Sequence, residues 1–334
     1  MKLILRVSPL LFLLFSLSCN NIKKQEENKV TDTIAVNLSA LNKKIVNDPN
    51  NAELYHLRAK YHFKNKDFNS ALSDMNRVLK LDSTKASYYL TLSEIYFVGN
   101  KTSKSKEALE KCIALDPKNT EALMKLGELF FYVRKYEESI EYLNKVLKED
   151  VHNSKAYFLK GMNYAEKGDT VHAVSSMQTA VEQNPDYYTA YIQLGILLAT
   201  KKDRLAIDYY NNAIKLQPKS TEAFYDKAKF FQDVQMWNEA ISTYNQLLTI
   251  DSMYAEAYYN LGAIDLLSKK DYKSALMHFD GAVKSNEKYA AAYYARGTCY
   301  LKLGEKNKAV ADFKTTLQLE PGYEPALKAM ENIR

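Results

Sequence analysis

The chain has 334 residues, a length that by itself would indicate two globular domains. Its 46 basic and 40 acidic residues leave a net charge of +6 and are spread along the chain, without the Lys/Arg stripe typical of nucleic-acid-binding proteins. The composition therefore argues against nucleic acid as a partner.

Residues 1–19 have the features of a secretory signal. Basic residues precede an apolar stretch, Val7 to Leu17, that is too short to cross a bilayer of about 30 Å. The ending at Cys19 resembles the bacterial lipoprotein signal, in which the cysteine is lipidated and becomes the mature N-terminus. Ser16 stands where that signal usually has an aliphatic residue. An ordinary signal peptide with an incidental cysteine, or an uncleaved anchor, are the alternatives.

Residues 20–37 are polar and of mixed charge, without apolar periodicity, which predicts a flexible tether. The lipoprotein resemblance implies that acyl chains on Cys19 hold the protein on a membrane, because a second chain turns reversible binding into anchoring. Asn20 is not the aspartate that in enteric bacteria resembles an inner-membrane retention signal, so the resemblance favours the outer membrane of the cell envelope. The periplasmic and the external face both stay open.

From residue 52 onward, particular residue types return about every thirty-four positions. One column is small and comprises Ala59, Ser93, Gly127, Gly161, Gly195, Ala228, Gly262 and Gly297. A second small column follows twelve residues later, and a bulky apolar column four residues after that comprises Met75, Leu109, Leu143, Met177, Tyr210, Tyr244, Phe279 and Phe313. The chain is therefore an array of one repeated unit, which overrides the two-domain expectation.

Within each unit, apolar residues recur at spacings of three and four in two runs separated by a polar turn, which predicts two antiparallel helices. The small columns are expected where two backbones approach closely. The columns resemble the tetratricopeptide repeat, as in "AYIQLGILL" from Ala190. The resemblance implies an all-α, right-handed superhelical solenoid of about eight repeats over residues 52–323. These repeats start at Ala52, Ala86, Thr120, Ser154, Tyr188, Thr221, Ala255 and Ala290.

Helices at residues 38–51 and 324–334 are interpreted as caps, because terminal repeats would otherwise leave an apolar face open to water. The first cap offers Leu41 and Ile45 at helical spacing, and the second offers Leu327 and Met330. Cys112 and Cys299 fall on helix faces and are expected to be small core residues.

Asp265 breaks the pattern, because the other repeats place Tyr, Phe, Leu or His at that position. An unpaired buried carboxylate is costly, and the seventh repeat is one residue longer than most. We therefore expect the helix to slip locally, so that Leu266 is buried and Asp265 turns outward.

The sequence lacks a Gly-rich phosphate loop, His-Glu-x-x-His, Cys-x-x-Cys and Gly-x-Ser-x-Gly. It thus predicts no catalytic residue, no metal site and no cofactor, and the protein is not expected to be an enzyme. Family members that bind the free C-terminal carboxylate of chaperones carry Lys at the fifth and Asn at the ninth position of one repeat. None of the eight repeats has Lys at its fifth position.

The inner face of the first helices lines a concave groove in this family, so the resemblance implies a protein or peptide partner there. A helix that is apolar on its packing side and again on its groove side must be covered, either by a partner or internally, by tight superhelical winding or by the N-terminal segment. The predicted groove residues are Leu90, Phe97, Met124, Phe131, Tyr132, Phe158, Met162, Ile192, Tyr225, Tyr259 and Tyr294.

These features are interpreted as a non-enzymatic scaffold, lipid-anchored through Cys19 in a bacterial outer membrane, that holds a protein partner in its groove. Envelope assembly, secretion and recruitment of a cell-wall enzyme are the roles considered. The alternative is a surface receptor for a glycan or another small nutrient, with aromatic rings stacking on sugars. Trp237, the single tryptophan, falls at the start of a second helix, away from the groove, and this weakens the alternative.

Overall fold

The computed structural model describes residues 38–333, which form α-helices and one five-residue π-helix without a β-strand. The all-α fold class predicted from the repeat columns is confirmed. The predicted signal, Cys19 and the tether lie outside the described residues. Among the helices of residues 38–333, none is long and apolar enough to cross a membrane.

Helices α4 to α19 form successive antiparallel pairs. The first helices of the pairs are α4 (Ala52–Lys64), α6 (Ala86–Val98), α8 (Thr120–Tyr132), α10 (Ser154–Glu166), α12 (Tyr188–Thr200), α14 (Thr221–Asp233), α16 (Ala255–Ile264) and α18 (Ala290–Lys302). The second helices are α5 (Phe68–Leu81), α7 (Thr102–Leu115), α9 (Tyr136–Glu149), α11 (Thr170–Gln183), α13 (Leu205–Leu216), α15 (Trp237–Ile250), α17 (Tyr272–Ser285) and α19 (Lys306–Leu319). The first helices begin at the residues that the sequence columns give as repeat starts.

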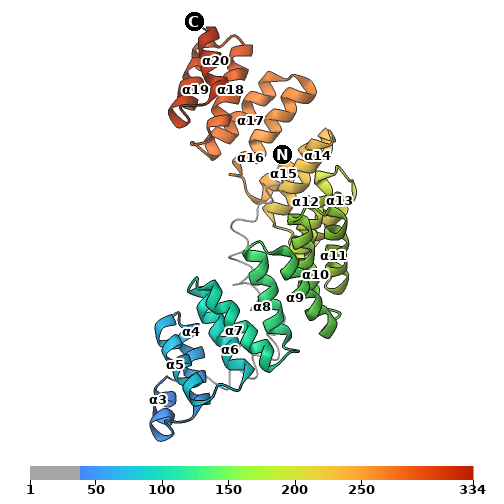
Figure 1. The fold of residues 1–334 in the computed structure, drawn as a ribbon. Coiled ribbons are helices and arrows are strands. Elements are labelled where there is room, and N and C mark those ends of the chain that lie inside the picture. Colours follow the sequence, from blue (N-terminus) through green and yellow to red (C-terminus); the bar gives the residue numbers. More distant parts are fainter. Residues whose placement is uncertain (1–37, 334) are drawn as a thin grey trace. The chain divides into compact units, whose positions relative to one another are not determined.

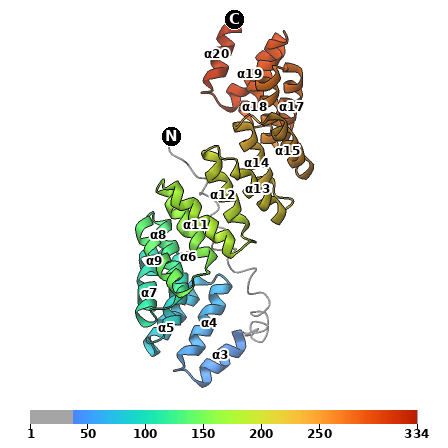
Figure 2. The same cartoon turned by 90° about the vertical axis from the view of Figure 1, so that its right-hand side faces the viewer.

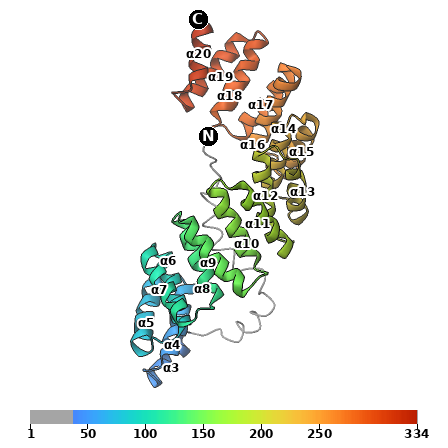
Figure 3. The same ribbon diagram turned by 45° about the vertical axis from the view of Figure 1, so that its right-hand side comes forward.

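The chain divides into two compact units, residues 1–176 (unit 1) and 177–334 (unit 2), with the boundary inside α11. In unit 1, α4 to α10 pack side by side in chain order (Figure 1), and α3 (Leu38–Asn47) packs on α4 (Figure 2). In unit 2, α12 to α19 pack in the same way, and α20 (Glu324–Ile333) lies against α19 (Figure 3). Each unit is therefore a stack of helix pairs closed at one end by a single helix.

The small column and the bulky column meet inside each helix pair. A Cβ atom added to Gly127 would lie 2.9 Å from a methyl carbon of Leu143, and one added to Gly195 would lie 2.5 Å from the ring of Tyr210. Protein interiors are close-packed, so a side chain at either glycine would force the two helices apart. A serine in the second small column can also hydrogen-bond across the helix pair. Ser139 Oγ donates to the carbonyl oxygen of Gly127 at 2.7 Å. The column spacing thus encodes the helix-pair interface.

The turn between the two helices of every pair contains one residue with positive φ. Glycine fills this position twice, as Gly168 and Gly304, both with φ of 83°. The other six pairs use a non-glycine residue, and the six are Lys66, Asn100, Arg134, Lys202, Gln235 and Lys270. A left-handed conformation costs a non-glycine residue about 1–2 kcal/mol, so these six turns store strain that the helix packing offsets.

The expected outward turn of Asp265 is wrong. Asp265 is buried at 5% exposure, and one of its carboxylate oxygens lies 2.8 Å from Nδ1 of His278. The additional residue of the seventh repeat is accommodated by a π-helix, Asp265–Lys269, in which Leu266 is half-buried and Leu267 is exposed. A π-helix inserts one residue without breaking the helix, and the imidazole supplies the partner that makes burial of the carboxylate tolerable.

Both caps are present, but they differ in how far the sequence predicted them. In α3, Leu41 and Ile45 are buried as expected. In α20, Ala326 is buried and Met330 packs against the Phe313 core, whereas Leu327 is 43% exposed, contrary to expectation. The packed face of α20 is therefore rotated by one residue from the predicted one, toward small Ala326.

Candidate partner-binding surface

The predicted groove residues separate into three classes by burial. Tyr132 is exposed, and Leu90, Phe97, Tyr225, Tyr259 and Tyr294 are half-buried. Five are buried and are not available as an open surface: Met124, Phe131, Phe158, Met162 and Ile192. The interpretation of these five as exposed groove residues is therefore corrected, and they belong to the packing of the helix stack.

The cause is direct contact between first helices of neighbouring repeats. In unit 1, α8 contacts α10, and in unit 2, α12 contacts α14. Side chains at the fifth, ninth and twelfth positions therefore fill the space between first helices. Phe131 also packs against Tyr136, with ring centroids 6.0 Å apart. Internal winding, the second answer that the sequence left open, explains these positions.

Unit 1 keeps a small apolar surface at the C-terminal ends of α6 and α8. Val98 and Tyr132 are exposed there, and the rings of Phe97 and Tyr132 meet edge to face at 6.1 Å. This patch comes from only two repeats and has no recurring geometry.

Unit 2 carries a recurring arrangement of tyrosines. In each of its last three repeats, the tyrosine at the fifth position of the first helix packs against a tyrosine that lies two helices further along the chain, immediately before α16, α18 or α20. The ring centroids are 5.5 Å apart for Tyr225–Tyr254, 5.3 Å for Tyr259–Tyr289 and 5.3 Å for Tyr294–Tyr323. We call these six residues the tyrosine strip.

A second aromatic contact fixes the fifth-position ring of each pair. Tyr225 packs on Tyr244 at 6.2 Å, Tyr259 on Phe279 at 5.5 Å and Tyr294 on Phe313 at 5.6 Å. These partners are the buried bulky residues of the column described above. The strip therefore rests on the rigid core of the helix pairs, which holds its rings in place before any ligand arrives.

Most hydroxyl groups of the strip have no partner within residues 38–333. Asn260 Nδ2 donates to the Tyr225 hydroxyl at 3.5 Å, but no intramolecular hydrogen bond engages the hydroxyls of Tyr259, Tyr289, Tyr294 or Tyr323. None of these four hydroxyl oxygens is a fully buried atom without a partner. Since the four make no internal hydrogen bond, they reach the surface. Burial, and then neighbouring groups of the strip, raise the pKa of Tyr259, Tyr289 and Tyr323, which keeps their hydroxyls protonated as donors.

Acidic side chains lie on two of the first helices that carry the strip. Glu222 and Glu256 occupy the second position of α14 and α16 and are exposed. Glu222 accepts a hydrogen bond from Tyr188 at 3.2 Å, and within the described chain no ion pair engages Glu256. Glu256 lies close enough to Tyr289 for its charge to contribute to the raised pKa of that hydroxyl, after burial.

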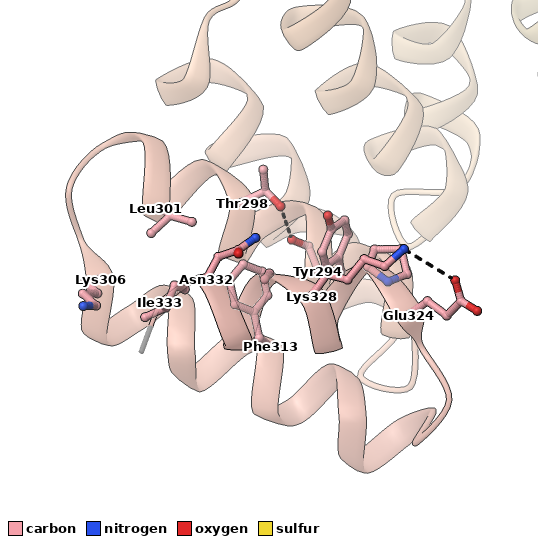
Figure 4. Close-up of a pocket in the computed structure, with 11 residues that line it drawn as sticks. Tyr294, Thr298, Leu301, Lys306, Phe313, Glu324, Lys328, Asn332 and Ile333 are labelled. Atoms are coloured by element: carbon pink, nitrogen blue, oxygen red, sulfur yellow. Dashed lines mark hydrogen bonds and ion pairs between the residues drawn. The ribbon is translucent and has the colours of Figure 1, made fainter.

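One end of the strip reaches a pocket of about 630 Å³ between α18, α19 and α20. Figure 4 shows Tyr294 and Phe313 in this pocket, with Lys306 toward one end and Lys328 toward the other. Lys328 Nζ lies 4.0 Å from Glu324, and Lys306 has no ion-pair partner in residues 38–333. Acidic groups are present at this end as well, because the charge of Glu320 contributes, after burial and neighbouring tyrosines, to the raised pKa of Tyr323.

The lysine–asparagine pair that the eight repeats lack occurs on α20. This helix begins at Glu324, so Lys328 and Asn332 take its fifth and ninth positions, and both line the pocket. The pair was missed because α20 is a first helix without a second one, and it lies outside the eight complete repeats. Continuing the repeat numbering from residue 324 would have identified this lysine–asparagine pair from the sequence.

The described residues contain no group of three or more His, Cys, Asp or Glu residues that could hold a metal ion. Cys112 and Cys299 are buried, as expected for small core residues, and burial raises the pKa of each thiol to about 11. Both thiols are therefore protonated and unreactive near neutral pH.

Comparison with known families agrees with the helix-pair architecture. Family models described as tetratricopeptide repeat match residues 52–85, 86–119, 124–188 and 290–323, and one described as TPR repeat matches residues 235–264. The chain belongs to the tetratricopeptide-repeat proteins. Repeats of this family are generally non-catalytic, and this chain is a scaffold for protein–protein interaction.

Relatives share the repeats rather than whole proteins. The chain is 28% identical over 173 residues to Superkiller complex protein 3 of Mus musculus, covering 49% of this chain and 11% of the relative. It is 25% identical over 178 residues to DnaJ homolog subfamily C member 3 of Rattus norvegicus, covering 48% and 35%. The solved C-terminal part of a repeat protein from Cytophaga hutchinsonii matches with a TM-score of 0.63 at 18% identity, over 71% of this chain and 97% of that one. This last likeness shows the fold.

Proposed function

We propose that this scaffold is anchored by lipid on Cys19 in a bacterial outer membrane and holds an extended segment of a protein partner on the tyrosine strip. The strip is the observation that carries the binding part of the proposal. Tyrosine rings offer a large contact area with little conformational freedom to lose, and their hydroxyls add directional hydrogen bonds. Six such rings lie on one unit, and the hydroxyls of Tyr259, Tyr289, Tyr294 and Tyr323 make no hydrogen bond within the described residues. Such a surface suits a partner recognised through its side chains and main chain.

The anchoring part rests on the resemblance of residues 1–19 to a lipoprotein signal. Acyl chains on Cys19 would hold the protein at the membrane, and the polar residues 20–37 would separate the repeats from the lipid surface. The partner would then belong to envelope assembly or secretion, or be a cell-wall enzyme that the scaffold recruits.

Site-specific cross-linking tests the binding part. A photoreactive phenylalanine analogue at position 259, inside the strip, should cross-link one envelope protein in intact cells. The same analogue at position 277, an exposed methionine on second helix α17, is the matched control and should not. Equal cross-linking of that protein at both positions, or none at position 259, would remove the strip as the partner-binding surface.

Fractionation tests the anchoring part. Cys19→Ala should release the mature protein into the soluble envelope fraction, because acylation requires the thiol. Ser18→Ala leaves the thiol in place and should remain with the membranes. Membrane retention of the Cys19→Ala protein in cells that lack the cross-linked partner would contradict the lipid anchor.

A further inference from the structure

Unit 1 has two edges formed by turns. The turn edge comprises residues 64–70, 98–104, 132–138 and 166–172, which run from the last residue of each first helix to the third residue of the second helix. The opposite edge comprises residues 47–54, 81–88, 115–122 and 149–156, where one pair passes to the next. Because the pairs pack side by side in chain order, each set of turns lies along one edge of the stack.

The two edges differ in charge. The turn edge has seven basic and five acidic residues, whereas the opposite edge has three basic and seven acidic residues. On the opposite edge every basic residue forms an ion pair: Lys85 with Glu53, Lys118 with Glu149 and Lys155 with Glu128. On the turn edge, five exposed basic side chains have no ion-pair partner among the described residues: Lys64, Lys66, Lys101, Lys104 and Arg134.

The acidic residues of the turn edge all have partners inside the protein. Glu137 pairs with Lys167, Glu138 with Lys135 and Asp169 with His172. Asp67 accepts from the backbone nitrogen of Ser70, and Glu166 accepts from the hydroxyl of Tyr136. The charge that this edge leaves unpaired is therefore positive.

Exposed apolar side chains lie among these cations. Val98, Tyr132 and Val133 stand at the ends of α6 and α8, and Val171 lies in the first turn of α11. Membrane surfaces bind this combination of groups, because apolar and tyrosine side chains enter the headgroup region while Lys and Arg contact lipid phosphates.

The N-terminal segment joins unit 1 at this same edge. Helices α3 and α4 are connected by only four residues, 48–51, and pack as an antiparallel hairpin, so Leu38 lies toward the C-terminal end of α4. Residues 20–37 can span at most roughly 60 Å. A chain of this length keeps the turn edge at high effective concentration near any lipid that carries Cys19.

We propose that the turn edge of unit 1 lies on an anionic lipid surface, with its unpaired basic side chains on lipid phosphates and its exposed apolar side chains among the headgroups. The inference rests on the proposed lipid anchor and says which edge of unit 1 faces the membrane. Each basic residue near an anionic bilayer raises affinity about fivefold. This attraction holds unit 1 at the near end of the separations that residues 20–37 allow.

Fluorescence on vesicles tests the orientation. The chain from residue 20 onward, which carries no acyl group, receives an environment-sensitive fluorophore at Val133→Cys on the turn edge or at Val151→Cys on the opposite edge. Both valines are exposed, and Cys112 and Cys299 are buried and stay unlabelled. Vesicles that contain phosphatidylglycerol should shift the emission to the blue at position 133 and not at position 151. No shift at 133, or equal shifts at both positions, would overturn the proposal.

Charge reversal tests the chemistry. Lys64→Glu, Lys101→Glu and Lys104→Glu together should lower the affinity for these vesicles at least about tenfold. The matched control reverses three exposed lysines in the C-terminal halves of α5, α7 and α9, Lys80, Lys111 and Lys148, and should lower it about twofold at most. Vesicles of phosphatidylcholine alone should bind at least about tenfold more weakly. Equal losses in the two triple variants would contradict the inference, because net charge and not this edge would then govern binding.

Other occupants have distinct outcomes. A concentration-dependent shift at position 133 without vesicles would assign the turn edge to a second copy of the chain, whose opposite edge is acidic, and would overturn the proposal.

The result is separable from that of the lipid anchor. The turn edge alone binds reversibly, and about 1 M NaCl, which shortens the Debye length to about 3 Å, should remove it from vesicles. Release of the Cys19→Ala protein after such a wash of the membranes therefore still tests the anchor. If that protein is released but the vesicles give no shift at position 133, the anchor stands and the membrane-facing edge is wrong.

Discussion

Arg296 and Asp312 form a two-pronged ion pair inside the last repeat. Nε of Arg296 donates to Oδ2 of Asp312 at 2.9 Å, and Nη2 donates to Oδ1 at 2.8 Å. Nη1 reaches back to Asp280 on the preceding helix, also at 2.9 Å. The same geometry recurs in the first repeat. There Arg58 donates two hydrogen bonds to Asp74 and a third to Asn42 on the preceding helix. The two terminal repeats thus each tie three helices together.

Removing the arginine of this tie should destabilise unit 2. Asp312 is almost fully buried, so Arg296→Ala would leave a buried carboxylate unpaired, at a cost of about 3–5 kcal/mol. Lys284→Ala removes an exposed partner of Asp280 and should change stability by less than about 1 kcal/mol. Urea unfolding of both variants measures the difference. Equal effects would mean that the buried pair contributes no more than the surface pair.

The aromatic residues of the predicted groove differ in burial, so their substitutions should differ in the stability they cost. Phe158 is 3% exposed, so Phe158→Ala should lower the free energy of unfolding by about 3–5 kcal/mol. Tyr132 is 51% exposed, and Tyr132→Ala should cost less than about 1 kcal/mol. Chemical denaturation distinguishes the two. A stable Phe158→Ala protein would restore this residue as a candidate surface group.

The strained turns offer sites for stabilisation. Arg134 adopts φ of 60°, so Arg134→Gly should raise the free energy of unfolding by about 0.5–1 kcal/mol by removing the left-handed penalty. The adjacent Lys135 has φ of −95° and is the N-cap of α9, so Lys135→Gly relieves no left-handed strain and should raise the free energy of unfolding less than Arg134→Gly does. Thermal melts of the two variants measure the direction of the change in Tm. A loss of stability in Arg134→Gly would show that the left-handed conformation of Arg134 is not strained.

His56 should make unit 1 sensitive to acid. Burial lowers the pKa of its imidazole from 6.5 to about 4, in a site where Nε2 lies 2.9 Å from the hydroxyl of Thr91. The unfolded chain therefore binds the proton more readily than the folded chain between pH 6.5 and 4. The stability that neutral His56 contributes is complete above pH 6.5 and is lost as the pH falls toward 4, by up to about 3 kcal/mol.

Comparison of the wild type with His56→Gln isolates this effect from the carboxylates. The variant keeps a polar side chain near Thr91 but cannot gain the proton. Urea midpoints at pH 7 and pH 4.5 should therefore differ less in the variant than in the wild type. An identical loss in both proteins would assign the acid sensitivity to other groups.

The repeat columns predicted the fold because each column meets a local packing need. A small residue at Gly127 and a bulky one at Leu143 are sixteen residues apart, a spacing that a single helix pair sets. Such contacts lie within one repeat and can be read from its spacing. The candidate site was predicted only in part, since Tyr225, Tyr259 and Tyr294 were identified but their partners Tyr254, Tyr289 and Tyr323 were not.

The sequence by itself determined the helix pairs, their start residues and the interior columns, because the identity of a column residue follows from contacts inside its own repeat. Only the tertiary structure decided which apolar residues of the first helices remain exposed, since that depends on how closely neighbouring first helices approach. In the tertiary structure Phe158 is buried and Tyr132 is exposed to solvent. Asp265, in the π-helix, is buried against His278. These outcomes depend on contacts between helices that the spacing of one repeat does not specify.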